Sequence, residues 1–269
     1  MLSAKAWRGE LVIWFCAAQL ASLCVGLTCI GVLQKAGFAA FQPLTGAGAI
    51  VLSTLAFQGA TWVLIFFFLR MHHMRWRDAF GLRRAELHHV WFPTVPVVVV
   101  FLPVAWGLQG LALHVFTSLG WPTENEAAVT ALTSARTWWL RTYLGAFTLV
   151  IAPVAEEFIF RGMLYPFLKQ FHWPALTRFL RQLGWPRLAW FSRHRVWRML
   201  AWLGVSFLFA LIHGDAVAFV PLFLLALILT RLYERTGSLL APITAHALFN
   251  AANLVLLCFF QGEVESGQP

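Results

Sequence analysis

The chain has 269 residues, of which 60% are hydrophobic and only 12% are charged. Soluble domains carry about 25% charged residues, so this composition excludes an ordinary soluble protein. It predicts an integral membrane protein with a single transmembrane domain over residues 1–269. The formal net charge of +9 is compatible with a nucleic-acid partner. The basic residues lie in loops between apolar segments, however, which is typical of membrane orientation and contact with anionic lipid headgroups. We therefore expect a bilayer with anionic headgroups, and no nucleic acid, as a partner.

Apolar segments follow one another along most of the chain. A helix that spans a bilayer needs about 20 predominantly apolar residues. The segments predict an all-α, polytopic bundle with seven spans, at residues 11–33, 44–69, 90–116, 138–168, 199–213, 217–232 and 239–260. The third span is interrupted by Pro93, Pro96 and Pro103, and the fourth continues past a pair of glutamates.

The lysines and arginines predict the orientation of these spans. Most of them lie before the first span, after the second, between the fourth and fifth, and at the end of the sixth. All of these places fall on one side of a seven-span protein, and an excess of basic residues marks the cytoplasmic side. The other side holds few basic residues, among them Lys35 and Arg141. We therefore predict a cytoplasmic N-terminus and a C-terminus on the opposite side.

The longest predicted loop, residues 171–198, combines arginines with several tryptophans. Tryptophan prefers the level of the headgroups, and arginine pairs with lipid phosphate. This mixture predicts an amphipathic helix that lies on the cytoplasmic surface of the membrane.

The fifth and sixth spans are short. A helix of 15 residues, such as residues 199–213, is only about 22 Å long, against a hydrocarbon core of about 30 Å. The two spans therefore predict a shallow hairpin that turns near His213, Gly214 and Asp215. Such a hairpin would bring His213 into the interior of the membrane, where it could share a site with the other polar residues.

Four ionisable side chains lie in apolar sequence, and each is costly inside a membrane, which makes it a candidate functional residue. The first two are Glu156 and Glu157. Glu157 and Arg161 are four residues apart, so on a helix they share a face and can form an ion pair. Glu156 points about 100° away from that pair on a helical wheel. We predict that Glu157 and Arg161 support the structure, while Glu156 faces a cavity and acts as a general base.

The other two are His213 and His246, and each belongs to a pair of residues four positions apart. Phe209 shares a helical face with His213, and His246 shares one with Asn250. A lone histidine in an apolar segment is more often structural than catalytic, and Asn250 could simply bond to a neighbouring helix. In the functional interpretation, the histidines would act as bases or metal ligands, and Asn250 would donate a hydrogen bond to an oxyanion. The spacing does not separate the roles of the two histidines.

Together the three clusters resemble the signature of the type II CAAX prenyl endopeptidases and their prokaryotic relatives, the CPBP family of intramembrane glutamic proteases. In this chain the three motifs read Glu156-Glu157-x-x-x-Arg161, Phe209-x-x-x-His213 and His246-x-x-x-Asn250. The resemblance covers roughly residues 140–260, which would form the catalytic core region. A short Phe80-Gly81-Leu82-Arg83 stretch is also of a kind found in the family.

The resemblance implies a role for each motif residue. Glu156 and His213 would activate the attacking water, and His246 and Asn250 would hold the oxyanion. Glu157 and Arg161, with Phe209, would support the site. No metal or other cofactor is expected. Zinc bound by Glu156, His213 and His246 remains an alternative on ligand chemistry alone.

The sequence therefore predicts an intramembrane endopeptidase that hydrolyses a peptide bond of a membrane-anchored peptide or protein. The compact chain and its short loops favour a prokaryotic cytoplasmic membrane. Two other classes of function remain as alternatives. One is a non-catalytic immunity or partner protein on the same fold. The other is a proton-coupled transporter that uses Glu156, His213 and His246 as a relay.

Overall fold

The computed structural model describes residues 7–42, 46–82, 87–123, 127–135, 137–170, 178, 182–184 and 194–266. Within these ranges all regular structure is helical, as the sequence predicts. The helices are α1 (Gly9–Lys35), η1 (Ala39–Phe41), α2 (Ala47–Thr54), η2 (Leu55–Gly59), α3 (Ala60–Met71), α4 (Trp76–Phe80), α5 (Leu87–Ser118), α6 (Ala127–Ser134), α7 (Trp138–Ala146), η4 (Phe147–Ile151), α8 (Ala152–Glu157), η5 (Phe158–Leu164), α9 (Tyr165–Gln170), α11 (His194–Ile212), α12 (Phe219–Thr236) and α13 (Leu240–Ser266).

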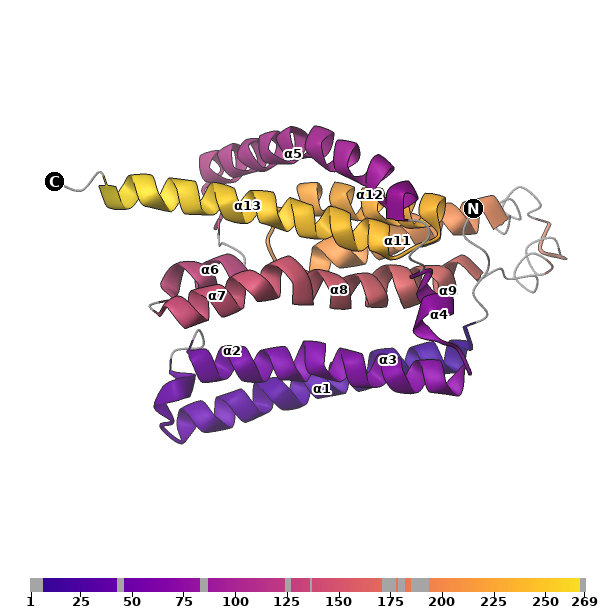
Figure 1. The fold of residues 1–269 in the computed structure, drawn as a ribbon, viewed down its shortest axis with the longest axis horizontal. Helices are drawn as coiled ribbons and strands as arrows, with labels where there is room; N and C mark the ends of the chain where they lie inside the picture. The colour runs from indigo at the N-terminus through magenta and orange to yellow at the C-terminus, as the bar shows by residue number, and fades with distance from the viewer. Residues whose placement is uncertain are drawn as a thin grey trace.

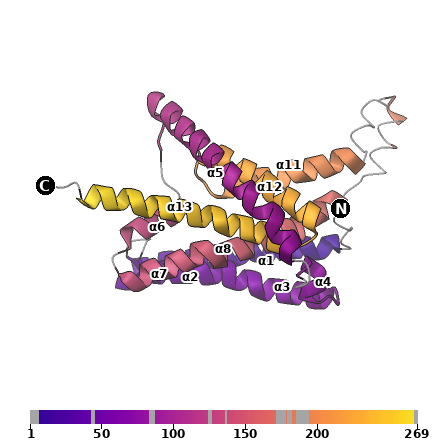
Figure 2. The same cartoon turned by 45° about the horizontal axis from the view of Figure 1, so that its top comes forward.

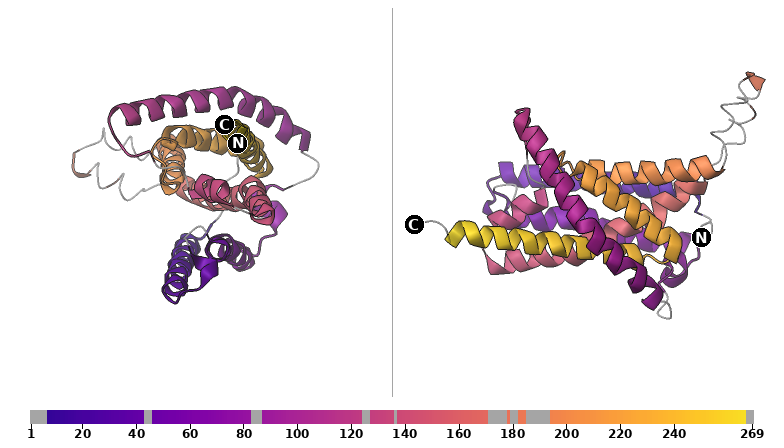
Figure 3. Two further views of the ribbon diagram at one scale, coloured as in Figure 1. Left: turned by 90° about the vertical axis from the view of Figure 1, so that its left-hand side faces the viewer. Right: turned by 90° about the horizontal axis from the view of Figure 1, so that it is seen from above.

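Five helical stretches are long and apolar enough to cross a membrane, which confirms a transmembrane bundle. They are Gly9–Lys35, Ala47–Met71, Val90–Ser118, Trp138–Gln170 and Leu240–Phe259. The apolar part of α11 is shorter, and α12 carries Arg231, Glu234 and Arg235 in its last turns. Both nevertheless run through the bundle, where α11 packs against α12 and α12 packs against α13 (Figure 3). The predicted total of seven spans therefore depends on α11 and α12 and stays a prediction.

The helix α11 differs from the predicted fifth span. It begins at His194, five residues before the predicted start at Met199, so that residues 194–198, the end of the predicted amphipathic loop or helix, are continuous with the span. Most of the predicted amphipathic loop, residues 171–198, lies outside the described residues. The turn between α11 and α12 lies short of the end of the bundle that α7 and α13 reach (Figures 1 and 3). A turn at this position is what a shallow hairpin requires, and the hairpin itself stays a prediction.

The helix α5 remains one continuous helix through Pro93, Pro96 and Pro103, where the sequence predicts interruptions. Proline removes a backbone hydrogen bond and bends a helix rather than ending it when neighbouring helices support the chain. The result is a curved helix that crosses α12 and α13 obliquely (Figures 2 and 3). Its first half is therefore packed on the helices that carry the candidate site.

Three π-helical segments, η2, η4 and η5, interrupt the two long spans that contain them. A π-turn changes the backbone hydrogen-bond pattern, and such segments are common at functional sites. In each segment a side chain from another helix or segment donates to a carbonyl oxygen. Gln19 donates to Phe57 in η2 (2.9 Å), Asn250 to Thr148 in η4 (2.9 Å), and Trp7 to Gly162 in η5 (3.0 Å).

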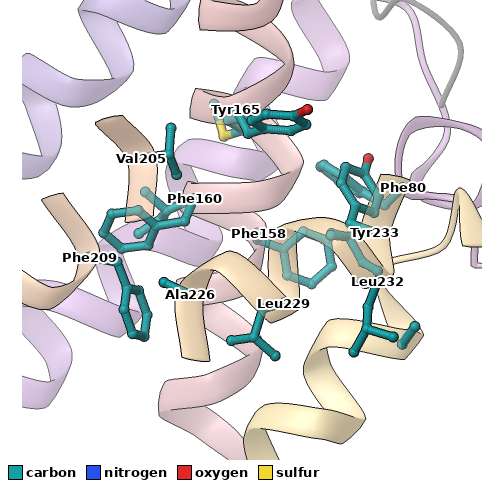
Figure 4. Close-up of a cluster of buried hydrophobic side chains, with 14 of the residues drawn as sticks. Phe80, Phe158, Phe160, Tyr165, Val205, Phe209, Ala226, Leu229, Leu232 and Tyr233 are labelled. Carbon is teal, nitrogen blue, oxygen red and sulfur yellow. The ribbon is translucent and has the colours of Figure 1, made fainter. Parts of the chain in front are cut away.

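The buried core surrounds the helix that carries the two glutamates (Figure 4). The Phe158 ring packs edge-on against Phe80, with ring centroids 4.5 Å apart, and the Phe160 ring packs edge-on against Phe209 at 5.3 Å. The carbonyl oxygen of Phe80 accepts a hydrogen bond from the amide of Leu239, at the start of α13 (3.0 Å). Phe80 therefore links the N-terminal half of the chain to the two helices that bear the motifs.

Gly81, which follows Phe80, is expected to tolerate no side chain. It has a φ of +67°, and a Cβ there would overlap the carbonyl oxygen of Gly237. Gly120 has nearly the same φ, +68°, but nothing lies within 4 Å of its Cβ position. We expect Gly120→Ala to cost about 1–2 kcal/mol of stability, for the left-handed backbone alone. Gly81→Ala should cost about 1–3 kcal/mol more, because backbone atoms must move apart.

Thermal or denaturant unfolding of the two variants in the same detergent measures this difference. The Gly120→Ala variant serves as the matched control for backbone strain. Equal losses in the two variants would mean that the close approach of Gly81 to Gly237 does not limit the fold.

Candidate active site

The structure gathers the predicted site residues from three parts of the fold. Glu156 and Glu157 end α8, and Arg161 follows in η5. His246 and Asn250 lie one turn apart in α13, which packs against α8. His213 comes directly after the end of α11. The centre of the arrangement is therefore the contact between α8 and α13, with the end of α11 beside it.

Glu157 is fully buried and connects two of the motifs. Its Oε1 accepts a hydrogen bond from Nη1 of Arg161 (2.7 Å) and another from Nδ1 of His246 (3.0 Å). The ion pair expected from the four-residue spacing is present, and both of its side chains are 0% exposed. The contact with His246, which is 89 residues away, is not visible in any local pattern. Glu157 thus ties the first motif to the third.

Arg161 is completely enclosed, and most of its donors are satisfied by neighbouring groups. Nη2 donates to the carbonyl oxygen of Ala226 (3.1 Å), and Nε lies 3.4 Å from the hydroxyl of Thr230, both in α12. The guanidinium also lies over the ring of Phe209, 4.6 Å from its centroid. A buried charge is tolerated only when it is paired and hydrogen-bonded. Arg161 therefore joins α12 and α11 to the glutamate helix.

The two nitrogen atoms of His246 face different glutamates. A carboxylate only accepts hydrogen bonds, so Nδ1 must carry the proton that it shares with Glu157. In the neutral ring this leaves a lone pair on Nε2. Nε2 lies 3.8 Å from Oε2 of Glu156, which is too long for a direct hydrogen bond. The side chain of Glu156 is 15% exposed and that of Glu157 is 0% exposed, so Glu156 is the more accessible of the two.

Phe209 separates and orients the two histidines. Its ring centroid lies 4.6 Å from that of His213 and 5.6 Å from that of His246. Nδ1 of His213 bonds to the carbonyl oxygen of Phe209 (2.7 Å), so it too must be the protonated nitrogen. Both neutral imidazoles therefore keep a lone pair on Nε2, and both pack against the same aromatic ring.

Asn250 is held against the helix that precedes the glutamates. Its Nδ2 donates to the carbonyl oxygen of Thr148 in η4 (2.9 Å). A carboxamide has two N–H donors, so one of them remains for another acceptor. Asn253, three residues further along α13, accepts a hydrogen bond from the indole of Trp106 in α5 (2.8 Å). The motif helix is thus fixed on one side by η4 and on the other by α5.

Sequence reasoning missed several of the groups that hold this site. Thr148 and Ala226 contribute only carbonyl oxygens, for which the residue type gives no signal. Thr230 is a polar residue in the apolar stretch of α12 and is fully buried. Its place in that stretch could have indicated a buried hydrogen-bond partner. The indoles of Trp7 and Trp106 bond to segments more than 100 residues away.

In the described part of the chain, the candidate residues do not form a metal-binding arrangement. There, no three side chains of the histidine, cysteine, aspartate or glutamate type converge closely enough to hold a metal ion. The two carboxylates and the two imidazoles contact one another, Arg161 and Phe209.

Comparison with known proteins finds a family match for part of the chain. No curated protein and no solved structure gave a match. A family model does match, and it covers the segment from α7 to α13, which contains all three motifs. Residues 137–252 match the type II CAAX prenyl endopeptidase Rce1-like family, which confirms the family that the motifs resemble.

Proposed function

We propose that the chain is an intramembrane endopeptidase of the glutamic type, in which Glu156 activates the water that attacks a peptide bond. The family of residues 137–252 is a family of membrane endopeptidases. The observation that carries the finer proposal is the position of His246 between the two glutamates. Glu157 fixes Nδ1 of His246 at 3.0 Å, and Nε2 then points toward Oε2 of Glu156 at 3.8 Å. The carboxylate of Glu156, the imidazole of His246 and the carboxylate of Glu157 thus form a row. Such a row can move a proton without a metal.

The first step places a water molecule against Oε2 of Glu156. Glu156 takes one proton while the water oxygen bonds to the carbonyl carbon of the substrate. His213 contributes its Nε2 lone pair as a second acceptor for the water, which is the role that the resemblance implies. The electron pair of the carbonyl bond moves to its oxygen and creates the oxyanion. No covalent bond to the enzyme forms.

Glu156 next passes its proton to Nε2 of His246. The resulting imidazolium is stabilised by Glu157, as a buried carboxylate stabilises the imidazolium of a serine-protease triad. Nε2–H of His246 and the remaining N–H of Asn250 then donate to the oxyanion. When the carbon–nitrogen bond breaks, the leaving nitrogen takes the proton from His246. The products are a carboxylic acid and an amine, and Glu156 returns to its ionised form.

The proposed substrate is a membrane-anchored peptide or protein segment. The site lies within helices that cross the bilayer, between α8 and α13. The peptide bond that is cleaved must therefore lie near an apolar segment that brings it into the membrane. The compact chain is the reason for proposing a prokaryotic cytoplasmic membrane as its location. Prenylation of the substrate is not required by the geometry.

The test is cleavage of a library of membrane-anchored peptides by the purified protein in proteoliposomes, with new termini detected by mass spectrometry. We expect Glu156→Gln to lower the cleavage rate by about 10²–10⁴-fold, because the amide cannot take the proton of the water. Glu10→Gln is the matched control, since Glu10 is an exposed glutamate at the start of α1. The proposal is wrong if the wild-type protein produces no new termini, or if the folded Glu156→Gln variant cleaves at the wild-type rate.

A further inference from the structure

Glu234, in the last turn of α12, is the centre of a second charged cluster away from the candidate active site. Its Oε1 accepts hydrogen bonds from the hydroxyl of Tyr165 (2.5 Å) and from the ammonium of Lys169 (2.9 Å). Its Oε2 lies 3.7 Å from Nη1 of Arg231. Arg198 lies in α11, which packs against both α9 and α12, and its positive charge acts on the same carboxylate. We call these five residues the Glu234 cluster.

The Glu234 cluster has a surplus of positive charge. It combines three cations, from α9, α11 and α12, with a single carboxylate. Burial raises the pKa of Glu234, but the hydrogen bonds from Tyr165 and Lys169 and the charges of Lys169 and Arg198 outweigh it and lower the pKa below its ordinary value. Glu234 therefore stays ionised at neutral pH, and it can neutralise only one of its three cationic neighbours.

The surplus charge lies toward the outside of the cluster. The side chains of Lys169 and Glu234 are only 13% and 15% exposed, whereas that of Arg231 is 53% exposed. Lys169 also contacts the ring of Tyr165, which holds it inward. Arg198 is half-buried at the side of α11. An anion approaching from outside would therefore meet the two guanidinium groups, whose planar donors suit the oxygens of a phosphate.

Exposed apolar residues continue α11 from Arg198 toward the middle of the bundle. Met199, Leu200 and Leu203 follow Arg198 along α11 and are 37–46% exposed. The end of α9, the end of α12 and the beginning of α11 lie together at one end of the bundle (Figure 3). The predicted orientation places this end at the cytoplasmic side. A cationic group at the end of an apolar helix surface matches a molecule with a phosphate and acyl chains, whereas a free phosphate would use only the cationic part.

We propose that the Glu234 cluster binds the phosphate of an anionic phospholipid headgroup, with Arg198 and Arg231 as its ligands and the acyl chains along α11. Lys169 and Glu234 form the neutral base of the site. Tyr165 lies one turn after Arg161 on the same helical stretch. A bound headgroup therefore stabilises the end of the helix that carries the glutamates. The proposal does not depend on hydrolysis, because none of the five residues belongs to the candidate active site.

The experiment uses the full chain, purified in detergent and stripped of lipid. Phosphatidylglycerol or phosphatidylcholine is added, and the melting temperature and the amount of retained lipid are measured, the latter by native mass spectrometry. We expect phosphatidylglycerol to raise the melting temperature and to remain bound, and phosphatidylcholine to do neither. Arg198→Gln/Arg231→Gln should weaken the apparent affinity for phosphatidylglycerol by about tenfold or more, since each basic residue near an anionic surface contributes about one power of ten or slightly less.

The matched control is Arg70→Gln/Arg75→Gln, which removes two exposed charges at the end of α3 and the start of α4. This control should retain phosphatidylglycerol like the wild-type protein. Equal losses in the two double variants would overturn the proposal, because they would indicate unspecific attraction to the whole basic face. A thermal shift of the same size with inorganic phosphate alone would also overturn it, in favour of a soluble anion. Arg198→Lys/Arg231→Lys keeps the charge and should retain part of the affinity.

Discussion

Replacement of Arg161 by leucine is expected to lower the free energy of unfolding by about 3–5 kcal/mol, because it leaves the buried carboxylate of Glu157 without its counter-charge. The side chains of Arg161 and Glu157 are both 0% exposed, so bulk solvent does not screen their 2.7 Å contact. The substitution also removes the hydrogen bond to the carbonyl of Ala226 in α12. Chemical or thermal unfolding in a fixed detergent measures the loss.

Two further variants separate the charge effect from packing. Glu157→Gln/Arg161→Leu removes both charges and should recover part of the stability that Arg161→Leu loses, since no uncompensated ion remains. Arg8→Gln is the exposed control: Arg8 and Glu10 form an ion pair whose side chains are 60% and 59% exposed. Its loss should stay within about 1 kcal/mol. If Arg161→Leu costs no more than Arg8→Gln, the pair does not hold the helices together.

Much of this architecture could be predicted from local pattern. The apolar segments predicted the spans to within a few residues, because lipid requires about 20 apolar residues and closed backbone hydrogen bonds. The Glu157–Arg161 pair followed from the four-residue repeat of one helix. The boundary that differs most is the start of α11, which lies at His194 rather than at Met199. Residues 194–198 include two arginines, so a search for apolar residues leaves them out of the span.

The features that escaped prediction involve backbone groups or long-range contacts. The π-turns of η2, η4 and η5 do not alter hydrophobic periodicity enough to be recognised in the sequence. The donors that reach their carbonyl oxygens, such as Asn250 and Trp7, come from distant helices. The partner of Asn250 is the main chain of Thr148, and any residue type at that position would offer the same oxygen. No side-chain pattern therefore indicates this hydrogen bond.

The two histidines show the same limit at the site itself. Each lies four residues from its motif partner in an apolar helix, so the sequence treats them alike. In the fold they differ: Nδ1 of His213 bonds to a carbonyl oxygen of its own segment, and Nδ1 of His246 bonds to Glu157. His246 contacts both glutamates, with Nδ1 3.0 Å from Oε1 of Glu157 and Nε2 3.8 Å from Oε2 of Glu156. This difference makes a substitution at His246 the sharper test of the proposed proton path.

We expect His246→Asn to lower kcat/KM for peptide cleavage by about 10²–10⁴-fold while the protein remains as stable as the wild type. The side-chain N–H of asparagine lies close to the position of Nδ1 in histidine, so it can still donate to Glu157 and keep the buried carboxylate satisfied. No atom of asparagine replaces Nε2, the group that faces Glu156 at 3.8 Å. The proton of the attacking water then has no path to the leaving nitrogen.

His246→Leu provides the complementary variant, because it removes both nitrogen atoms. It should lose activity to the same extent and also lose stability, since Glu157 forfeits a hydrogen bond in a fully buried position. His114→Asn, at an exposed position of α5, controls for the substitution itself and should change neither quantity. If His246→Asn retained wild-type activity, Nε2 would have no part in the reaction, and the proton path from Glu156 through His246 would have to be abandoned. If it lost stability as His246→Leu does, the hydrogen bond to Glu157 would depend on the imidazole ring, and the loss of activity could no longer be assigned to Nε2.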